Sequence, residues 1–293
     1  MKVINLLPAA IAVSMIASCS NREHNPELIS EVPVNVHVNG FTVSQEGFPS
    51  TKATSAVDYA GINAITLAFY QGSTEAFKKT QLRADESTFE TFGDFSTTLP
   101  MGSYTLVAVA YTTKEGSPFT LTSPTEAAYT GEHAYETFVC SQTVNITNTN
   151  ALDIDATLSR IVSKLQVVST DGKTANANNI RMTFSAGGKS FNPTTGLAIS
   201  NTGFANTVGI SAATGATSSS LSFIFLATDE QEIDVTVETL DANGNTLFSK
   251  KIEDVLFKRN RVTKLTGPMY SAAASGSFQL DTKWLDAVDD IAF

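Results

Sequence analysis

Apolar and polar residues alternate along much of the chain with a period of two. The clearest case lies between residues 31 and 39, where a valine occupies every second position (Val32, Val34, Val36 and Val38). Successive side chains of a β-strand point to opposite faces, so this pattern predicts a strand with one buried face and one polar face. Pro33 stands near its start and indicates an edge position, because proline has no N–H with which to join a second neighbour.

Several other segments also have strand patterns. Residues 104–111 (YTLVAVAY) and 221–227 (LSFIFLA) are apolar at consecutive positions, which is typical of central strands buried on both faces. Further strand-like segments are 65–70, 137–140, 152–158, 233–237 and 247–252. The Asn243-Gly244 pair between the last two predicts a β-hairpin. Residues 112–134 are rich in Gly, Pro, Ser and Thr, and they read as a long loop that can hold one short helix.

One segment, residues 160–168 (RIVSKLQVV), fits both helical and alternating spacing. We favour a strand, because β-branched residues are frequent in it and a turn signal follows at 170–173. Convincing helical patterns are absent elsewhere, and the length of 293 residues suits two domains. The sequence therefore predicts an all-β fold with two tandem β-sandwich domains, over residues 31–157 and 158–293. No clear linker separates them.

The first residues have the pattern of a secretory signal. Lys2 precedes an apolar run of about 15 residues, which is too short for an ordinary membrane-spanning helix. Ala17, Ser18 and Cys19 end this run and resemble the bacterial lipobox, in which the cysteine is acylated and becomes the new N-terminus. We therefore interpret residues 1–18 as a signal peptide, Cys19 as a lipid anchor, and residues 19–30 as a tether. By the same resemblance to bacterial lipoproteins, the absence of Asp at position 20 favours the outer membrane.

Composition removes several classes of function. The net charge is −10 with a pI near 4.8, which argues against nucleic-acid binding because phosphate contacts need clustered Lys and Arg. Few residues are available for histidine or zinc chemistry: His24, His37, His133, Cys19 and Cys140. After processing, Cys140 is the one remaining thiol. We interpret it as a buried, inert cysteine, and a catalytic nucleophile is the weaker alternative.

Motifs that carry chemistry are incomplete. Residues 187–190 (GGKS) resemble the end of a phosphate loop, but position 183 lacks the required glycine. Residues 241–252 resemble a calcium loop that lacks its glycine and its final glutamate. Asp153 and Asp155 share one strand face, where paired acids more often protect solubility than catalyse hydrolysis. We therefore expect no enzymatic activity, no metal and no cofactor.

Several local strings resemble the fimbrillin-like lipoproteins of Bacteroidales, which are subunits, tips and anchors of the type V pilus. Residues 50–54 (STKAT) are similar to that family's proteolytic processing site. Residues 158–165 (LSRIVSKL), residues 259–267 (RNRVTKLTG) and the tail that contains Trp284 are similar to strings that recur in the same order. The resemblance covers most of the chain and implies two transthyretin-like β-sandwiches.

The resemblance also implies assembly by strand exchange. Cleavage after Lys52 would remove the strand with the four valines and open a groove for a strand from a neighbouring subunit. The run 278–293, with Phe278, Leu280 and Trp284, is the candidate donor. Lys52 stands where the family usually has arginine. An uncleaved protein would keep its lipid and act as an anchor, and an ordinary loop lysine is the alternative interpretation of Lys52.

We therefore expect a structural and adhesive component of a cell-surface fimbria, as a subunit, tip or anchor. Its expected partners are other fimbrial subunits, the outer membrane through the lipid on Cys19, and host or bacterial surface molecules. An alternative is an outer-membrane surface lipoprotein that binds glycans or other nutrients. A hydrolase is the weakest of the three hypotheses, because the chain lacks the residues for it.

Overall fold

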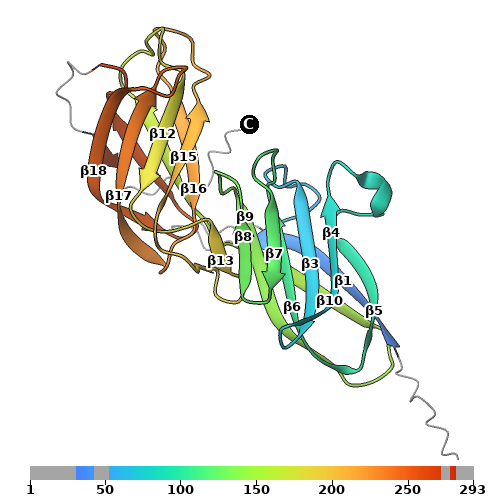
Figure 1. Ribbon diagram of the computed structural model, residues 1–293. Helices are drawn as coiled ribbons and strands as arrows, with labels where there is room; N and C mark the ends of the chain where they lie inside the picture. Colours follow the sequence, from blue (N-terminus) through green and yellow to red (C-terminus); the bar gives the residue numbers. More distant parts are fainter. Residues whose placement is uncertain (1–30, 43–52, 272–277, 282–293) are drawn as a thin grey trace, which may run out of the picture.

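The computed structural model describes residues 31–42, 53–271 and 278–281. This part of the chain is built from β-strands, with one short 3-10 turn, η1 (Glu86–Thr88), as its helical element (Figure 1). The strands form two lobes, and a small sheet lies between them. In the first lobe one eight-stranded sheet folds into two facing layers, and in the second lobe two separate sheets face each other. The predicted all-β fold is therefore confirmed.

The outer layer of the first lobe has β1 (Glu31–Thr42) at its centre. β10 (Leu152–Arg160) runs parallel to β1 on one side, and β5 (Asp94–Pro100) runs antiparallel on the other. The short strand β2 (Ala53–Thr54) pairs with the far end of β1. β1 is therefore an interior strand.

The inner layer of the first lobe contains four strands in the order β9-β6-β3-β4. Their bounds are β9 (Thr137–Ile146), β6 (Gly102–Tyr111), β3 (Ala64–Gln71) and β4 (Thr74–Leu82). The two layers meet where the last two residues of β10 pair with β9. The apolar faces of β1, β5 and β10 pack against those of β3 and β6 to form the core of the lobe.

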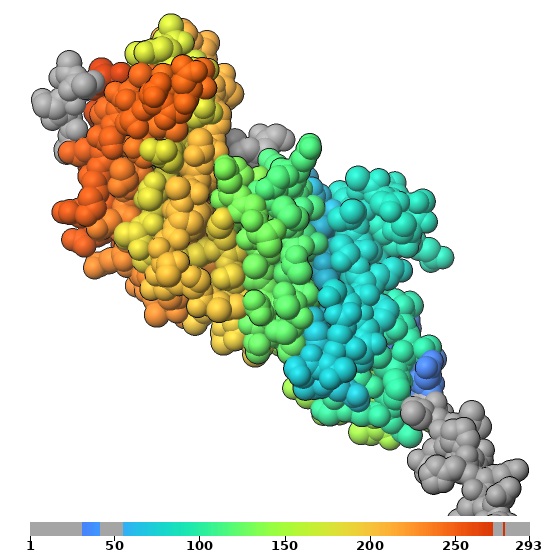
Figure 2. All heavy atoms as spheres, in the orientation of Figure 1, coloured from blue at the N-terminus to red at the C-terminus, as the bar shows by residue number. Residues whose placement is uncertain are grey.

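A small third layer covers the other face of β3 and β6. It contains β7 (Phe119–Ser123), β8 (Glu126–Tyr129), β13 (Ser190–Asn192) and β14 (Leu197–Ala198). The layer draws strands from both halves of the sequence, and its core contains the stacked rings of Phe191 and Phe225, 4.6 Å apart. Figure 2 shows the two lobes in contact along this layer.

In the second lobe, two four-stranded sheets pack face to face. One has the order β16-β11-β19-β20 and the other β15-β12-β17-β18. The first sheet contains β16 (Ser219–Ile224), β11 (Ser163–Ser169), β19 (Val262–Gly267) and β20 (Gln279–Asp281). The second contains β15 (Phe204–Gly209), β12 (Asn179–Phe184), β17 (Glu230–Leu240) and β18 (Thr246–Lys258). A separate apolar core fills the space between them.

The two lobes repeat one strand order. The sheets β5-β1-β10 and β4-β3-β6-β9 of the first lobe match β16-β11-β19 and β15-β12-β17-β18 of the second. Corresponding strands follow the same order along the chain, and the first strand of this shared order runs parallel to its last, β1 to β10 and β11 to β19. The hairpins β7–β8 and β13–β14 are inserted at different points of this shared order. β1 and β11 therefore have equivalent positions.

The structure agrees with some of the predictions made for single segments and contradicts others. The ambiguous segment 160–168 is extended, because β10 ends at Arg160 and β11 follows, and the hairpin at Asn243-Gly244 joins β17 to β18. The edge position inferred from Pro33 is wrong. β1 is flanked on both sides, and Pro33 is tolerated because the ladder with β10 begins one residue later, at Val34. The division of the chain at residue 157 stays a prediction.

The loop predicted over residues 112–134 is also wrong in part. This segment contains β7 and β8, which pair as a hairpin. Phe119, Leu121, Ala127 and Tyr129 occupy every second position of their strands and turn toward the third-layer core, so a short strand pattern is present among the turn-forming residues. The expected helix is absent from the described part of this segment.

Candidate functional site

The apolar face of β1 is completely covered. Val32, Val34, Val36 and Val38 have exposed fractions of 0–4%. The predicted burial of every second residue is therefore seen in the structure. Phe41 extends this face and is fully buried, with its ring 4.6 Å from the ring of Phe138 and 5.4 Å from that of Tyr59. Each such side chain stabilises the fold by roughly 1.5–3 kcal/mol.

The backbone of β1 is paired on both edges. Residues 31–37 pair with β5, and residues 34–42 pair with β10. β1 therefore separates two strands that do not pair with each other in the described residues. Ala53 and Thr54 of β2 pair with Thr42 and Phe41. The predicted processing residue Lys52, immediately before β2, lies outside the described residues.

The polar face of β1 contacts carboxylates of both neighbouring strands. Three side chains of β1 take part, and each has one carboxylate partner: Asn35 donates to Asp153 at 2.8 Å, His37 contacts Asp94 at 2.9 Å, and Asn39 donates to Asp155 at 2.5 Å. The hydrogen bond to Asp94 raises the pKa of His37, although burial acts in the opposite direction. Asp153 and Asp155, considered above as a catalytic pair, instead hold side chains of β1.

Arg160 at the end of β10 connects several elements near Phe41. It forms an ion pair with Glu136 at 2.6 Å and donates to the Tyr59 hydroxyl at 2.9 Å. Tyr59 donates to Glu136 at 2.7 Å, and burial, together with the charge of Glu136, raises the pKa of Tyr59. Arg160 also donates to Asn260 of the second lobe at 3.1 Å. Arg160, Glu136, Tyr59 and Asn260 are named here the Arg160 cluster. Because Tyr59 also contacts Phe41, this cluster links the end of β1 to the second lobe.

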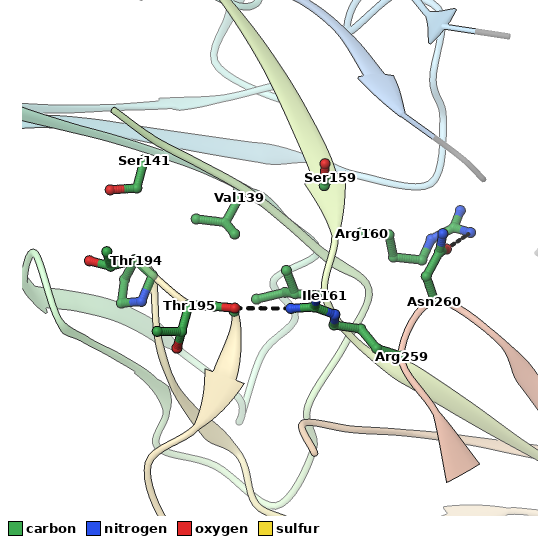
Figure 3. Close-up of a pocket in the computed structure, with 11 residues that line it drawn as sticks. Val139, Ser141, Ser159, Arg160, Ile161, Thr194, Thr195, Arg259 and Asn260 are labelled. Carbon is green, nitrogen blue, oxygen red and sulfur yellow. Dashed lines mark hydrogen bonds between the residues drawn. The ribbon is translucent and has the colours of Figure 1, made fainter. Parts of the chain in front are cut away.

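A cavity of about 350 Å³ with a mixed polar and apolar lining lies between the lobes. Its lining includes Ser141, Ser159 and the two arginines, Arg160 and Arg259. Figure 3 shows Arg160 turned toward Asn260, and Arg259 turned toward the Thr195 carbonyl oxygen, to which it donates at 2.9 Å. Arg259 also pairs with an aspartate at 2.7 Å. Both guanidinium groups already form hydrogen bonds and ion pairs within the protein. The hydroxyl groups of the lining are therefore more available to a ligand than the two positive charges are.

The remaining candidate chemistry is structural. Cys140 is half-buried, and burial raises its pKa, which disfavours the reactive thiolate. In the 187–190 segment, Lys189 donates to the Gly131 carbonyl oxygen. In the 241–245 segment, the Asp241 carboxylate accepts from backbone N–H groups of the hairpin turn. Across the described ranges, no group of three acidic, His or Cys side chains could hold a metal ion. No helix in them is long and apolar enough to span a membrane.

The candidate donor run begins beside the second lobe. Phe278 packs on the core of that lobe and lies against Gly267. β20 pairs antiparallel with β19, with Leu280 opposite Leu265. Trp284 and the lipidation candidate Cys19 lie outside the described residues. The structure therefore brings together the β1 residues, whereas Phe278 and Leu280 lie in the other lobe.

The sequence interpretation missed the residues that hold β1 in place. Asp94 was not singled out, because a carboxylate on an exposed strand position gives no signal of its own. Arg160 ends β10 and Glu136 immediately precedes β9, so their contact depends on the meeting of β9 and β10. The alternation in 94–100 (DFSTTLP), with Phe95 and Leu99 buried, is a signal that could have identified β5.

Comparisons with known proteins identify a family for this chain and solved structures that resemble it. Residues 33–291 match the model of a family of unknown function, DUF6562. No curated protein matches the chain. A candidate adhesin from Bacteroides ovatus has a similar structure, with a TM-score of 0.52, 12% identity, and coverage of 88% of this chain and 96% of that one.

Two further solved structures are similar. One, described as a candidate polysaccharide-binding protein (DUF1812) from Bacteroides thetaiotaomicron, has a TM-score of 0.51 and 10% identity, covering 88% of this chain and 99% of that one. The other is the fimbrial anchor protein Mfa2 from Porphyromonas gingivalis, with a TM-score of 0.47 and 11% identity, covering 85% of this chain and 95% of that one. At such identities, the two likenesses with TM-scores above 0.5 show a shared fold.

Proposed function

We propose, from the premise that this chain belongs to the DUF6562 family of unknown function, that it is a structural and adhesive component of a cell-surface fimbria. The position of β1 supports this proposal most strongly, because a strand at the start of the chain fills the centre of a layer. The shared fold with a candidate adhesin supports it as well. So does the ordered resemblance of the sequence strings to the fimbrillin-like lipoproteins of Bacteroidales.

In the proposed mechanism, cleavage after Lys52 separates β1 from the rest of the chain. β1 would then be held by its backbone ladders, its buried side chains and the contacts of its polar face with the neighbouring carboxylates. Its departure would leave a groove with β5 and β10 as walls and the apolar residues of β3 and β6 as floor. A strand with apolar side chains at every second position could enter this groove and restore both ladders.

The proposed donor is the run 278–293, which carries Phe278, Leu280 and Trp284. β20 at its start is the outermost strand of its sheet among the described residues. Strand pairing is therefore already part of this segment's structure. The lipid on Cys19 would hold the uncleaved chain at the outer membrane as an anchor, whereas cleavage would release it as a polymerising subunit or tip.

The test is to characterise the protein isolated from sheared cell-surface fibres. We expect wild-type protein in a ladder of oligomers that resist detergent, with Ala53 as its first residue by N-terminal sequencing. A Lys52→Gln variant should remain with the cells, with an acylated Cys19 detected by mass spectrometry. Wild-type protein that is monomeric, unacylated at Cys19 and absent from fibres would contradict the proposal.

Binding of surface polysaccharide is the second candidate function. The shared fold with a protein described as a candidate polysaccharide-binding protein favours it, and the cavity between the lobes has both hydroxyl and apolar side chains with which to contact a sugar. A glycan array should show saturable binding if this function holds. Loss of that binding in a Trp284→Ala variant would assign the tail to it.

A further inference from the structure

One wall of the groove, β5, has its backbone ladder with β1 alone among the described residues. The other wall, β10, also pairs with β9 through its last two residues. Departure of β1 would therefore leave β5 without a paired strand. Phe95 and Leu99 of β5 would keep their buried side chains in the core, but apolar burial has no direction and does not by itself fix where a strand lies.

Gln81 ties the start of β5 to the inner layer. It is the one buried residue of β4, with an exposed fraction of 0%. Its side-chain amide donates to the Asp94 carbonyl oxygen at 2.6 Å and accepts from the Gly93 N–H at 2.8 Å. The amide thus supplies the backbone of β5 with one donor and one acceptor, as a neighbouring strand would. Neither bond involves β1.

Gly93 suits a position between Gln81 and β1. While its N–H donates to Gln81, its carbonyl oxygen accepts from the Val38 N–H at 3.0 Å. Its φ is +105°, a conformation that residues with a side chain rarely adopt, and a Cβ atom there would lie 3.1 Å from the Val38 carbonyl oxygen. The local backbone therefore lets the start of β5 contact the inner layer and β1 at once.

Tyr104 of β6 ties the other end of β5. Its side chain is buried, and its hydroxyl donates to the carbonyl oxygen of Pro100, the last residue of β5, at 2.8 Å. Its ring packs edge-on against Phe69 of β3, with the ring centroids 6.2 Å apart. Both ends of β5 are thus held by buried side chains of the inner layer, and these contacts would remain if β1 left.

The equivalent strands of the second lobe are joined differently. Asn206 of β15 donates to the Ser222 hydroxyl of β16 at 2.7 Å, and both residues are buried. The contact reaches a side chain instead of the backbone, and the Asn206 Oδ1 atom has no hydrogen-bond partner in the described residues. The amide that holds the backbone of a wall therefore occurs in the lobe whose central strand is proposed to be replaced.

We propose that Gln81 and Tyr104 are positioning residues that hold β5 in place while the groove is empty, so that the chain keeps its own groove open to an incoming strand. This inference rests on the proposed function, since it concerns the groove that β1 leaves, and it applies to any strand that enters. A wall that is already in place need not be ordered during binding, and such pre-organisation favours association.

The test measures how fast an emptied groove captures a strand. The full chain is cut at Lys52 with trypsin, the released strand is removed by gel filtration, and a fluorescent peptide of residues 31–42 is added while its anisotropy is followed. We expect the double variant Gln81→Met, Tyr104→Phe to capture the peptide at about one tenth of the wild-type rate, and each single variant to lie between the two. The dissociation rate, measured with unlabelled peptide, should change less than the association rate.

The matched control is Thr66→Val in β3. Thr66 is buried in the same inner layer, but it faces the third layer, and its hydroxyl bonds to those of Thr80 at 2.8 Å and Tyr111 at 3.2 Å. The variant removes buried hydrogen bonds without touching β5, so its association rate should stay within about twofold of wild type. Urea unfolding of the intact chains shows that each variant is folded.

The outcomes separate the two proposals. If the cut wild-type chain releases no strand, or the emptied chain captures none, strand exchange is wrong and this inference is overturned with it. If wild type captures the peptide and the double variant does so within about twofold of its rate, or Thr66→Val slows capture equally, strand exchange stands and this inference is overturned. A change confined to the dissociation rate would also overturn it, because the residues would then stabilise the filled groove only. If the double variant does not fold, Tyr104→Phe, which removes a single hydroxyl, should still slow capture by about threefold, and an unchanged rate would overturn the inference.

Discussion

The two lobes share a strand order but hold their first strands differently. β1 buries five apolar side chains along 12 residues, whereas β11, of 7 residues, buries Leu165 and Val167 together with two serines. β11 follows β10 after two residues and is therefore fixed in the middle of the chain. β1 is joined to its lobe through residues 43–52, which include the proposed cleavage site. Under the proposed function, the same position thus holds a strand that cleavage would separate from the chain in one lobe, and a strand that stays within the chain in the other.

The walls beside the two strands also differ. The positions that flank the half-exposed side chains of β11 are Ser219, Leu221 and Phe223 on β16, and Val262, Lys264 and Thr266 on β19. None of them is acidic, in contrast to the three aspartates around β1. Topology alone therefore does not set what fills the central position. The side chains of the walls differ as well, and four variants test how far the difference between the lobes extends.

The largest effect should come from Phe41→Ala in β1. Phe41 is fully buried between two aromatic rings, so its removal should lower the free energy of unfolding by about 3–5 kcal/mol. Urea unfolding followed by circular dichroism measures the loss, and Val57→Ala, which truncates a side chain that is 48% exposed, is the control. A loss below about 1 kcal/mol would show that β1 contributes little to the first lobe.

Arg160→Met should have the next largest effect, because it leaves Glu136 and Tyr59 without their cation. Both members of the ion pair have side chains that are 17% exposed, and we expect a loss of about 2–3 kcal/mol in the same unfolding experiment. Adding Glu136→Gln should recover part of it. If the double variant is as unstable as the single one, the lost packing of Arg160 on Phe138 dominates instead.

Asp171→Asn should destabilise the second lobe more modestly. The Asp171 carboxylate accepts hydrogen bonds from the backbone N–H groups of Met269, Tyr270 and Ser271 at 2.7–2.9 Å. These bonds lower its pKa in spite of partial burial. Replacing the charged acceptor should cost about 1–2 kcal/mol. The control is Asp229→Asn, which removes the ion pair with Arg259 at a side chain that is 70% exposed. It should change the free energy of unfolding by less than about 0.5 kcal/mol.

The smallest effect should be a pH dependence carried by His37. Its pKa is raised in the folded chain by Asp94, with Asp153 and Asp155 adding to the shift. The stabilisation is therefore complete below the unfolded pKa of about 6.5 and is lost as pH rises through the higher folded value. Because the pair is exposed, we expect less than about 1 kcal/mol. The stability difference between wild type and His37→Gln, measured at pH 5.5 and pH 8.5 in low salt, should shrink at the higher pH. An equal stability difference at both pH values would show that His37 does not carry this pH dependence.

The sequence was most informative where one strand carries its own pattern. The valines of β1 alternate so regularly that their burial could be predicted without knowing any neighbour. What lies beside β1 could not be predicted, because Asp94 and Asp153 reach it from strands about 60 and 120 positions away. Pro33 was misread for the same reason, since an edge position depends on where β10 begins. The Arg160 cluster likewise depends on long-range contacts that no local spacing encodes.

The most direct measurement is hydrogen–deuterium exchange of the full chain before and after trypsin cleavage at Lys52, with the Lys52→Gln variant treated identically as the control. We expect cleavage to accelerate exchange in β1, β5 and β10, because their ladders then depend on a strand that can leave. Exchange in β11, β16 and β19 should not change. Unchanged protection in the first lobe, or equal loss of protection in both lobes, would contradict a replaceable strand in the first lobe alone.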